Sequence, residues 1–87
     1  MKNYRVKHLP DQKRFETTVD GFTGYVEYEV NSRVFDVIHT VVPKAIGGRG
    51  VAAALVKEAY AYAQSQGFET RGSCSYAALW LQRNSTQ

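Results

Sequence analysis

Residues 41–56 read VVPKAIGGRGVAAALV, and they place three of the chain's seven glycines, Gly47, Gly48 and Gly50, within four positions. A β-branched run precedes these glycines and an alanine-rich run follows them. The first turn of a helix carries unpaired N–H groups and a partial positive charge, so a glycine-rich approach lets an anion come close to bare backbone. Arg49 adds a full charge in the same loop. The segment indicates a phosphate-binding turn, although a plain strand-to-helix connection accounts for the glycines equally well.

Three side chains elsewhere could do chemistry on a ligand held at that turn. Cys74, the single cysteine, is expected just before the last helix, where a thiol pKa tends to fall and the thiolate becomes a nucleophile. His39 is expected on the same side of its strand as Val37 and Val41, and it could act as a general base near neutral pH. Glu27 could also accept a proton. Each has an alternative structural role: an inert apolar cysteine, a hydrogen-bonded histidine and a solvated glutamate.

Length and composition favour one small folded domain. The chain has 87 residues, of which 44% are hydrophobic and 22% charged, as in ordinary globular domains. The net charge of +3 comes from scattered basic residues, and Lys13-Arg14 is their only adjacent pair. We therefore expect an anionic small ligand, and neither a nucleic acid nor a membrane as partner.

The first twenty residues are charged and lack the apolar segment of a signal peptide. No apolar run approaches the roughly 18 residues of a membrane span. Together with the single cysteine, these features predict a cytoplasmic location. An uncovered sheet edge makes a homodimer a further expectation.

Three alternating segments rich in β-formers predict a meander, with strands at residues 14–19, 23–30 and 33–42. The tight turns between them are expected at Asp20-Gly21 and Asn31-Ser32. Pro43 ends the third strand because proline cannot donate to the ladder. Residues 4–8 predict a short edge strand.

After the glycines the apolar period changes to that of an amphipathic helix, over about residues 50–65. Gly67 stands where a C-terminal helix cap belongs. A short strand at residues 68–72 and a last helix at 75–83, with Ser75 as its N-cap, complete the chain. The expected class is α/β (α+β).

Two known motifs fit the glycine segment poorly. The letters GRGVAA match the dinucleotide fingerprint G-x-G-x-x-A, but that fold continues with several parallel strands, and only one short strand remains here. The segment IGGRGVAA also resembles the G-x-x-G loop of KH RNA-binding domains. That loop joins two helices, whereas a β-branched run ending in proline precedes this one.

The order of meander, long strand, glycine turn, helix and strand resembles the GNAT N-acetyltransferase core. The turn of that superfamily reads [Q/R]-x-x-G-x-[G/A], and Gly50 and Ala52 match it. Gly47 stands where glutamine or arginine is usual, so one side-chain contact is missing.

Within GNAT proteins, the chain is similar to the small single-domain acetyltransferase-like family of the YjdJ and N-acetyltransferase domain-containing protein 1 type. The matching letters are His39-Thr40, Val42-Pro43 and Cys74-Ser75-Tyr76. Two departures are Gly72, where the family often has proline, and the end NSTQ, where it often has His-Pro-Glu.

The resemblance implies an acetyl-CoA-dependent N-acetyltransferase acting on a small-molecule or peptide amine. It implies that Val41 and Val42 pair with the pantetheine amides. Tyr76 could donate to a departing thiolate, or could equally cap the core. The resemblance assigns the pyrophosphate to the turn residues Gly47, Gly48, Arg49, Gly50, Val51 and Ala52. Larger members hold the acceptor with helices between their first strands, and a two-residue turn fills that gap here. A non-catalytic CoA-binding or interaction module is therefore the alternative, and a KH-like domain a weaker third.

Overall fold

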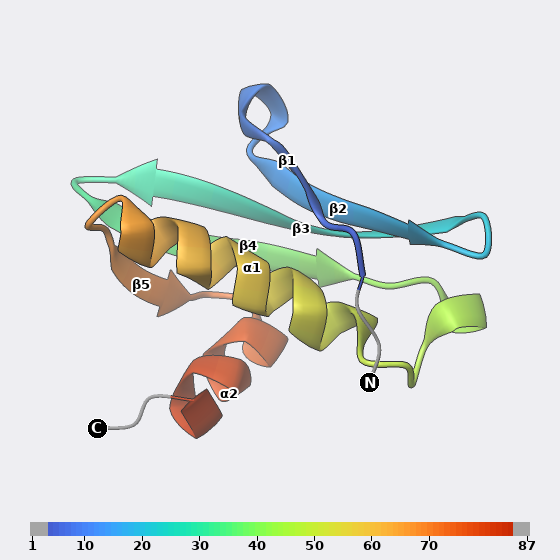
Figure 1. Cartoon of the computed structure of the whole chain (residues 1–87). Coiled ribbons are helices and arrows are strands. Elements are labelled where there is room, and N and C mark those ends of the chain that lie inside the picture. Colours follow the sequence, from blue (N-terminus) through green and yellow to red (C-terminus); the bar gives the residue numbers. More distant parts are fainter. Residues whose placement is uncertain (1–3, 85–87) are drawn as a thin grey trace.

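The computed structural model of the protein describes residues 4–84. Figure 1 shows a twisted sheet with two helices beside it. The elements in chain order are β1 (Lys7–Leu9), a 3₁₀ turn (Pro10–Gln12), β2 (Arg14–Val19), β3 (Phe22–Asn31), β4 (Val34–Val41), a 3₁₀ turn (Lys44–Ile46), α1 (Val51–Ser65), β5 (Glu69–Gly72) and α2 (Ser75–Asn84). The predicted mixed α+β class and the predicted order of elements are confirmed.

The five strands lie in the sheet in chain order, antiparallel from β1 to β4 and parallel between β4 and β5. Asp20 and Gly21 form the first hairpin turn with φ of 52° and 83°, as expected for the mirror-image turns that suit twisted strands. The second turn is at Ser32 and Arg33, with φ of 51° and 65°. It is one residue later than predicted, because Asn31 remains in β3 and pairs with Val34.

Helix α1 ends as the sequence predicts. Gly67 has φ of 77°, a left-handed conformation that glycine adopts without a Cβ penalty. The N–H of Gly67 donates to Gln64 O at 3.1 Å and that of Phe68 to Ala63 O at 3.0 Å. These two bonds make a Schellman cap. The chain is thereby turned directly into β5.

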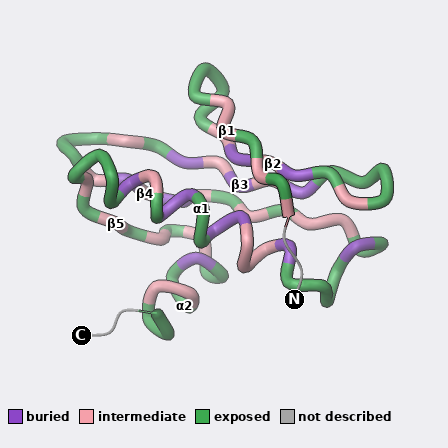
Figure 2. Tube along the Cα trace, in the orientation of Figure 1, coloured by how far each residue is buried: buried purple, intermediate pink, exposed green. Residues whose placement is uncertain are grey.

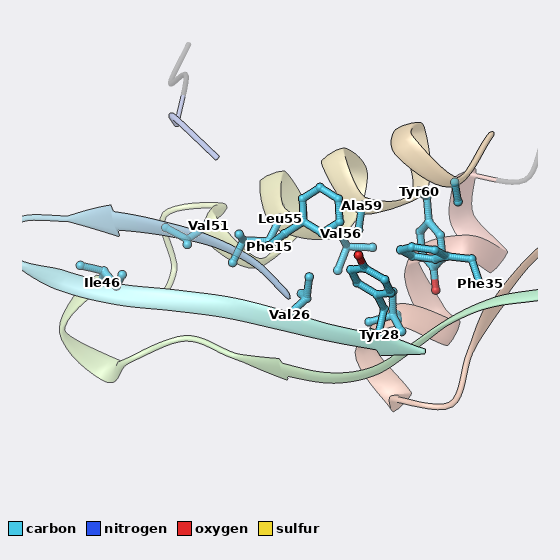
Figure 3. Packing of buried hydrophobic residues seen from close by; sticks show 13 residues of the cluster. Phe15, Val26, Tyr28, Phe35, Ile46, Val51, Leu55, Val56, Ala59 and Tyr60 are labelled. Atoms are coloured by element: carbon cyan, nitrogen blue, oxygen red, sulfur yellow. The ribbon is translucent and has the colours of Figure 1, made fainter. Parts of the chain in front are cut away.

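The core lies between one face of the sheet and α1. Figure 3 shows side chains of β2, β3 and β4 meeting those of α1, among them Tyr28, which stacks on Phe35 with ring centroids 4.4 Å apart. The hydroxyl of Tyr60 on α1 donates to Arg71 O on β5 at 2.6 Å. This bond fixes the helix to the far strand and satisfies a buried hydroxyl. The alternation expected for residues 23–30 holds, since Val26 and Tyr28 are buried.

A β-bulge interrupts β4 in its middle. Glu27 pairs with His39 and Tyr28 pairs with Val37, so Ile38 is an extra residue on the β4 side. Because one extra residue shifts all later side chains to the other face, His39 lies on the face opposite Val37. The prediction that these two residues share a side is therefore wrong.

Helix α2 lies next to α1 on the same side of the sheet (Figure 1). Its first intrahelical bond runs from Ala78 N–H to Cys74 O at 2.9 Å, which makes Cys74 the N-cap and Ser75 the first helical residue. The predicted Ser75 cap is thus displaced by one residue. Most of α2 is exposed (Figure 2), and Ala77 is its one buried residue among those described.

The strand character of β4 excludes the KH interpretation, because a KH loop joins two helices. Here strand β4 and a single 3₁₀ turn precede the glycines. Over residues 4–84, no helix is both long and apolar enough to cross a membrane.

Candidate functional site

The glycine loop presents a row of free backbone donors at the start of α1. Gly50 is the N-cap and offers no side-chain cap, and the first helical bond is Ala54 N–H to Gly50 O at 3.1 Å. Within residues 4–84, the six N–H groups from Gly48 to Ala53 have no hydrogen-bond partner. Six free donors at the positive end of a 15-residue helix can bind an anion.

The glycines are needed at two of the three positions. Gly48 and Gly50 have φ of 75° and 79°, and a Cβ at either would meet no atom within 4 Å. Their backbone conformation, and not crowding within the protein, therefore requires glycine. Gly47 has an ordinary φ of −70°. The open space above Gly48 and Gly50 leaves room for a ligand.

A cavity of about 420 Å³ opens at this loop. Its lining includes seven residues that the sequence assigned to cofactor binding, Val42, Gly47, Gly48, Gly50, Val51, Ala52 and Tyr76. Tyr76, on the first turn of α2, is 36% exposed. The structure therefore brings most of the predicted binding residues together around one hollow, between the start of α1 and the start of α2.

Arg49 does not face this cavity. Its guanidinium Nη1 lies 2.7 Å from Asp20 Oδ2 in the β2–β3 turn, and its carbonyl accepts a hydrogen bond from the Tyr4 hydroxyl at 2.6 Å. Lys44 lines the cavity instead. None of the ion pairs among the described residues involves Lys44. Sequence reasoning missed Lys44, although its place in the same short segment was a usable signal.

The sheet opens beside the cavity. Strand β5 pairs with β4 only as far as Val37 opposite Gly72, and Cys74 N–H then donates to Val37 O at 3.1 Å. Beyond this point the chain turns into α2, while β4 continues to Val41. From Ile38 onward, no described strand pairs with β4 on the β5 side. The resulting notch exposes a strand edge that can pair with an extended ligand.

Cys74 lies at the closed end of this notch. Its thiol donates to Thr40 Oγ1 at 3.4 Å. Burial alone raises the pKa of the Cys74 thiol, but its hydrogen bonds with the Thr40 side chain and with the Ala77 and Tyr76 backbone outweigh burial and lower the pKa below its usual value. The expected low-pKa thiol at a helix N-terminus is consistent with this environment.

Glu27 and His39 lie on the other face of the sheet. They are register partners across β3 and β4, so their side chains share a face. Glu27 Oε2 accepts a hydrogen bond from Arg14 Nη2 at 2.9 Å, and the Arg14 guanidinium lies 4.0 Å from the centre of the Tyr25 ring. His39 is exposed. The two candidate proton acceptors are thus near each other, but only His39 is without an ion-pair partner among the described residues.

A larger hollow of about 1150 Å³ runs over the outer side of α1 and α2 and shares Ala53 with the cavity at the loop. Its walls consist mainly of solvent-facing helix side chains. The helix amides in those walls, beyond the first turn of α1, are already used in helical bonds. The free donors lie at the smaller cavity, which is therefore the candidate site.

The comparisons with known proteins agree with this geometry. Residues 14–87 match the family model described as GCN5-related N-acetyl-transferase, and the chain belongs to this family. It is 30% identical over 83 residues to Protein NATD1 of Mus musculus, covering 92% of this chain and 76% of that protein. It is also 30% identical to Protein NATD1 of Homo sapiens, covering 92% and 74%.

The structural similarity extends over nearly the whole chain. An NMR structure from Staphylococcus aureus, described as GCN5-like, superimposes with a TM-score of 0.73 at 25% identity and covers 98% of this chain and 84% of that one. The predicted GNAT-like fold is thus confirmed.

Proposed function

We propose that the protein binds acetyl-CoA and transfers its acetyl group to an amine. The observation that carries this proposal is the row of six free amides over the loop cavity, in a chain that belongs to the GCN5-related N-acetyltransferases. A pyrophosphate carries the charge and the oxygen acceptors that such a helix N-terminus binds.

The residues present fit this ligand. Gly48 and Gly50 leave open space above their backbones, which allows phosphate oxygens to approach the amides from Gly48 to Ala53. The unpaired edge of β4 at Val41, followed by Val42, supplies backbone groups for the amides of the pantetheine arm. Tyr76 lines the same cavity from α2, and in this proposal its hydroxyl donates to the departing sulfur.

Bound acetyl-CoA supplies the acetyl group: the nitrogen of an uncharged amine bonds to the acetyl carbon as the carbon–sulfur bond breaks, and CoA leaves as its thiol. The chain's residues hold the two reactants together and take the proton that the nitrogen gives up. His39 is the better proton acceptor, because Glu27 is occupied by Arg14. Cys74, beside Thr40, is the candidate for a covalent route.

Calorimetry with CoA tests the binding step. Gly50→Val should abolish measurable binding, because a valine strains the φ of 79° and fills the space above the loop. Gly21→Val is the matched control, since Gly21 also has a positive φ and open space but lies in the β2–β3 turn. Unchanged affinity in a folded Gly50→Val protein contradicts the proposed site.

The second candidate function is CoA binding without catalysis. It is favoured by the bare face of the sheet around Glu27 and His39, which no helix of the described residues covers. A thiol-release assay with acetyl-CoA and a panel of amines separates the two candidates. CoA binding without thiol release for any amine would select the non-catalytic one.

A further inference from the structure

The sheet face that points away from α1 and α2 is unusually polar and open. We call it the outer face. By strand register its described members are Lys7, Leu9, Arg14, Glu16, Thr18, Thr23, Tyr25, Glu27, Glu29, Asn31, Val34, Asp36, His39, Val41, Glu69 and Arg71. None of these residues is buried. Both helices pack on the opposite face, because Ala77 of α2 lies against Gly72 and α1 covers the side chains of Val26 and Val37.

Charge is distributed unevenly between this face and the rest of the molecule. The outer face holds five of the chain's eight acidic residues and three of its eleven basic residues. Its net charge is therefore −2 in a protein of net charge +3. A cationic partner is attracted to this face and repelled by the remainder of the surface.

Two carboxylates stand directly opposite each other on this face. Glu29 and Asp36 are register partners across β3 and β4, an arrangement that is unfavourable without a cation. Asp36 accepts hydrogen bonds from Ser73 N–H at 2.8 Å and Ser73 Oγ at 2.7 Å. Arg71 Nε lies 3.9 Å from Asp36 Oδ2. Glu29 is exposed and has no ion pair among the described residues.

The outer face is also the open approach to the notch between β4 and β5. On the inner side of the sheet, Tyr76 of α2 and the start of α1 line the loop cavity. His39 and Val41, the residues after the bulge, point to the outer face. The outer face therefore offers an acceptor amine a route to the notch that no described helix covers.

We propose that the outer face binds a basic, lysine-containing segment of another protein and presents one lysine amine to the notch. This inference rests on the proposed acetyl transfer. The chemistry of the face favours a polypeptide over a small polyamine, because small-molecule sites are concave and enclosed. This face is instead an open sheet whose charges are spread over five strands.

The experiment uses the full chain and a fluorescent lysine-rich peptide, with spermidine as the small-polyamine probe. Anisotropy measures peptide binding without acetyl-CoA, and thiol release measures turnover of both probes. The test variant is Glu29→Lys with Glu69→Lys, because both side chains are exposed on the outer face. The control is Glu58→Lys, on the exposed side of α1.

We expect the double variant to weaken peptide binding at least tenfold and to lower kcat/KM for the peptide by a similar factor. The affinity for CoA should stay the same, and the control should change peptide binding less than twofold. Added salt should weaken binding to the wild-type chain, since the attraction is between exposed charges.

Three results overturn the proposal: no peptide binding by the wild-type chain, an equal loss in the Glu58→Lys control, or a higher kcat/KM for spermidine than for the peptide. Failure of the acetyl-transfer proposal looks different, because it appears as absent CoA binding or absent thiol release. In that case the anisotropy of the wild-type and double-variant chains still tests peptide binding, because it is measured without CoA.

Discussion

Two cations flank the glycine loop, and their neighbours give them different roles. Arg49 is paired with Asp20, whereas Lys44 lines the cavity and lacks an ion-pair partner among the described residues. Lys44→Ala should weaken CoA binding about fivefold, as for a partly exposed charged contact worth about 1 kcal/mol. Arg49→Ala should weaken it less than twofold. Calorimetry at low and high salt measures both, and a larger loss for Arg49→Ala would contradict this assignment.

The environment of the Cys74 thiol leads to a second prediction at the scale of single residues. Its pKa is lowered although burial opposes the shift, because hydrogen bonds to Thr40 and to α2 amides stabilise the thiolate. The alkylation rate of Cys74 should therefore rise with pH around a midpoint below the usual pKa of a cysteine thiol. Thr40→Val removes one of these bonds and should raise the midpoint. A pH–rate profile with iodoacetamide measures it, and an unchanged midpoint in Thr40→Val would refute the role of the hydroxyl.

The residues of the loop itself could be predicted because they are local. Glycines before a helix indicate free amides regardless of the tertiary structure, and the cavity lies at these glycines. The side chain of Arg49 could not be placed, because its partner Asp20 is 29 positions away in the sequence. Tertiary pairing of this kind leaves no mark on the spacing of the residues.

At the scale of elements, strands and helices were predicted well where period and turn chemistry agree, as in β2 and α1. The bulge at Ile38 was not predicted. One extra residue in a strand changes no composition and leaves both halves alternating, so only the pairing with β3 reveals it. Because of this error, the candidate site residue His39 was predicted on the wrong face of the sheet. It faces away from the helices.

Gly72 joins two elements and gives a prediction for them. A Cβ at Gly72 would lie 2.7 Å from Ala78 N and 2.8 Å from Ala77 C, both backbone atoms that cannot move alone. Gly72→Ala should therefore displace α2 and lower the free energy of unfolding by about 1–3 kcal/mol. Thr70→Ala, on the same strand and face, is the control, and denaturant unfolding measures both. Equal stability of Gly72→Ala and the wild type would show that α2 shifts freely.

For the whole molecule, pH acts through a histidine that the sequence did not single out. His8 on the edge strand β1 stacks on Phe15 at 4.1 Å, and its Nε2 lies 2.6 Å from the Tyr28 hydroxyl. Burial lowers the pKa of His8 below 6.5, so the folded state binds the proton less well than the unfolded state. The contribution of His8 to stability should be complete above pH 6.5 and should decrease as the pH falls below 6.5.

Thermal unfolding between pH 5.5 and pH 8 measures this effect. His8→Phe keeps an aromatic ring against Phe15 and removes the titrating group, so its melting temperature should depend less on pH over this range. A His8→Phe protein with the same pH dependence as the wild type would show that other groups cause it.

The bulge at Ile38 also sets where the chain tolerates changes in length. In a regular strand, side chains alternate strictly between the two faces of the sheet. Ile38 is an extra residue that shifts this alternation for the three residues after it. Deleting Ile38 would make Val37 and His39 adjacent, so alternation would keep His39 and Val41 on the outer face and Thr40 near Cys74. If Ile38 instead paired with Glu27 without a bulge, His39 and Val41 would lie beneath the helices and Thr40 would turn away from Cys74. Insertions at the Asp20-Gly21 turn leave the alternation of side chains in β2 and β3 unchanged. Whether Ile38 is bulged or paired therefore decides which face of the sheet receives the His39 imidazole and which receives the Thr40 hydroxyl.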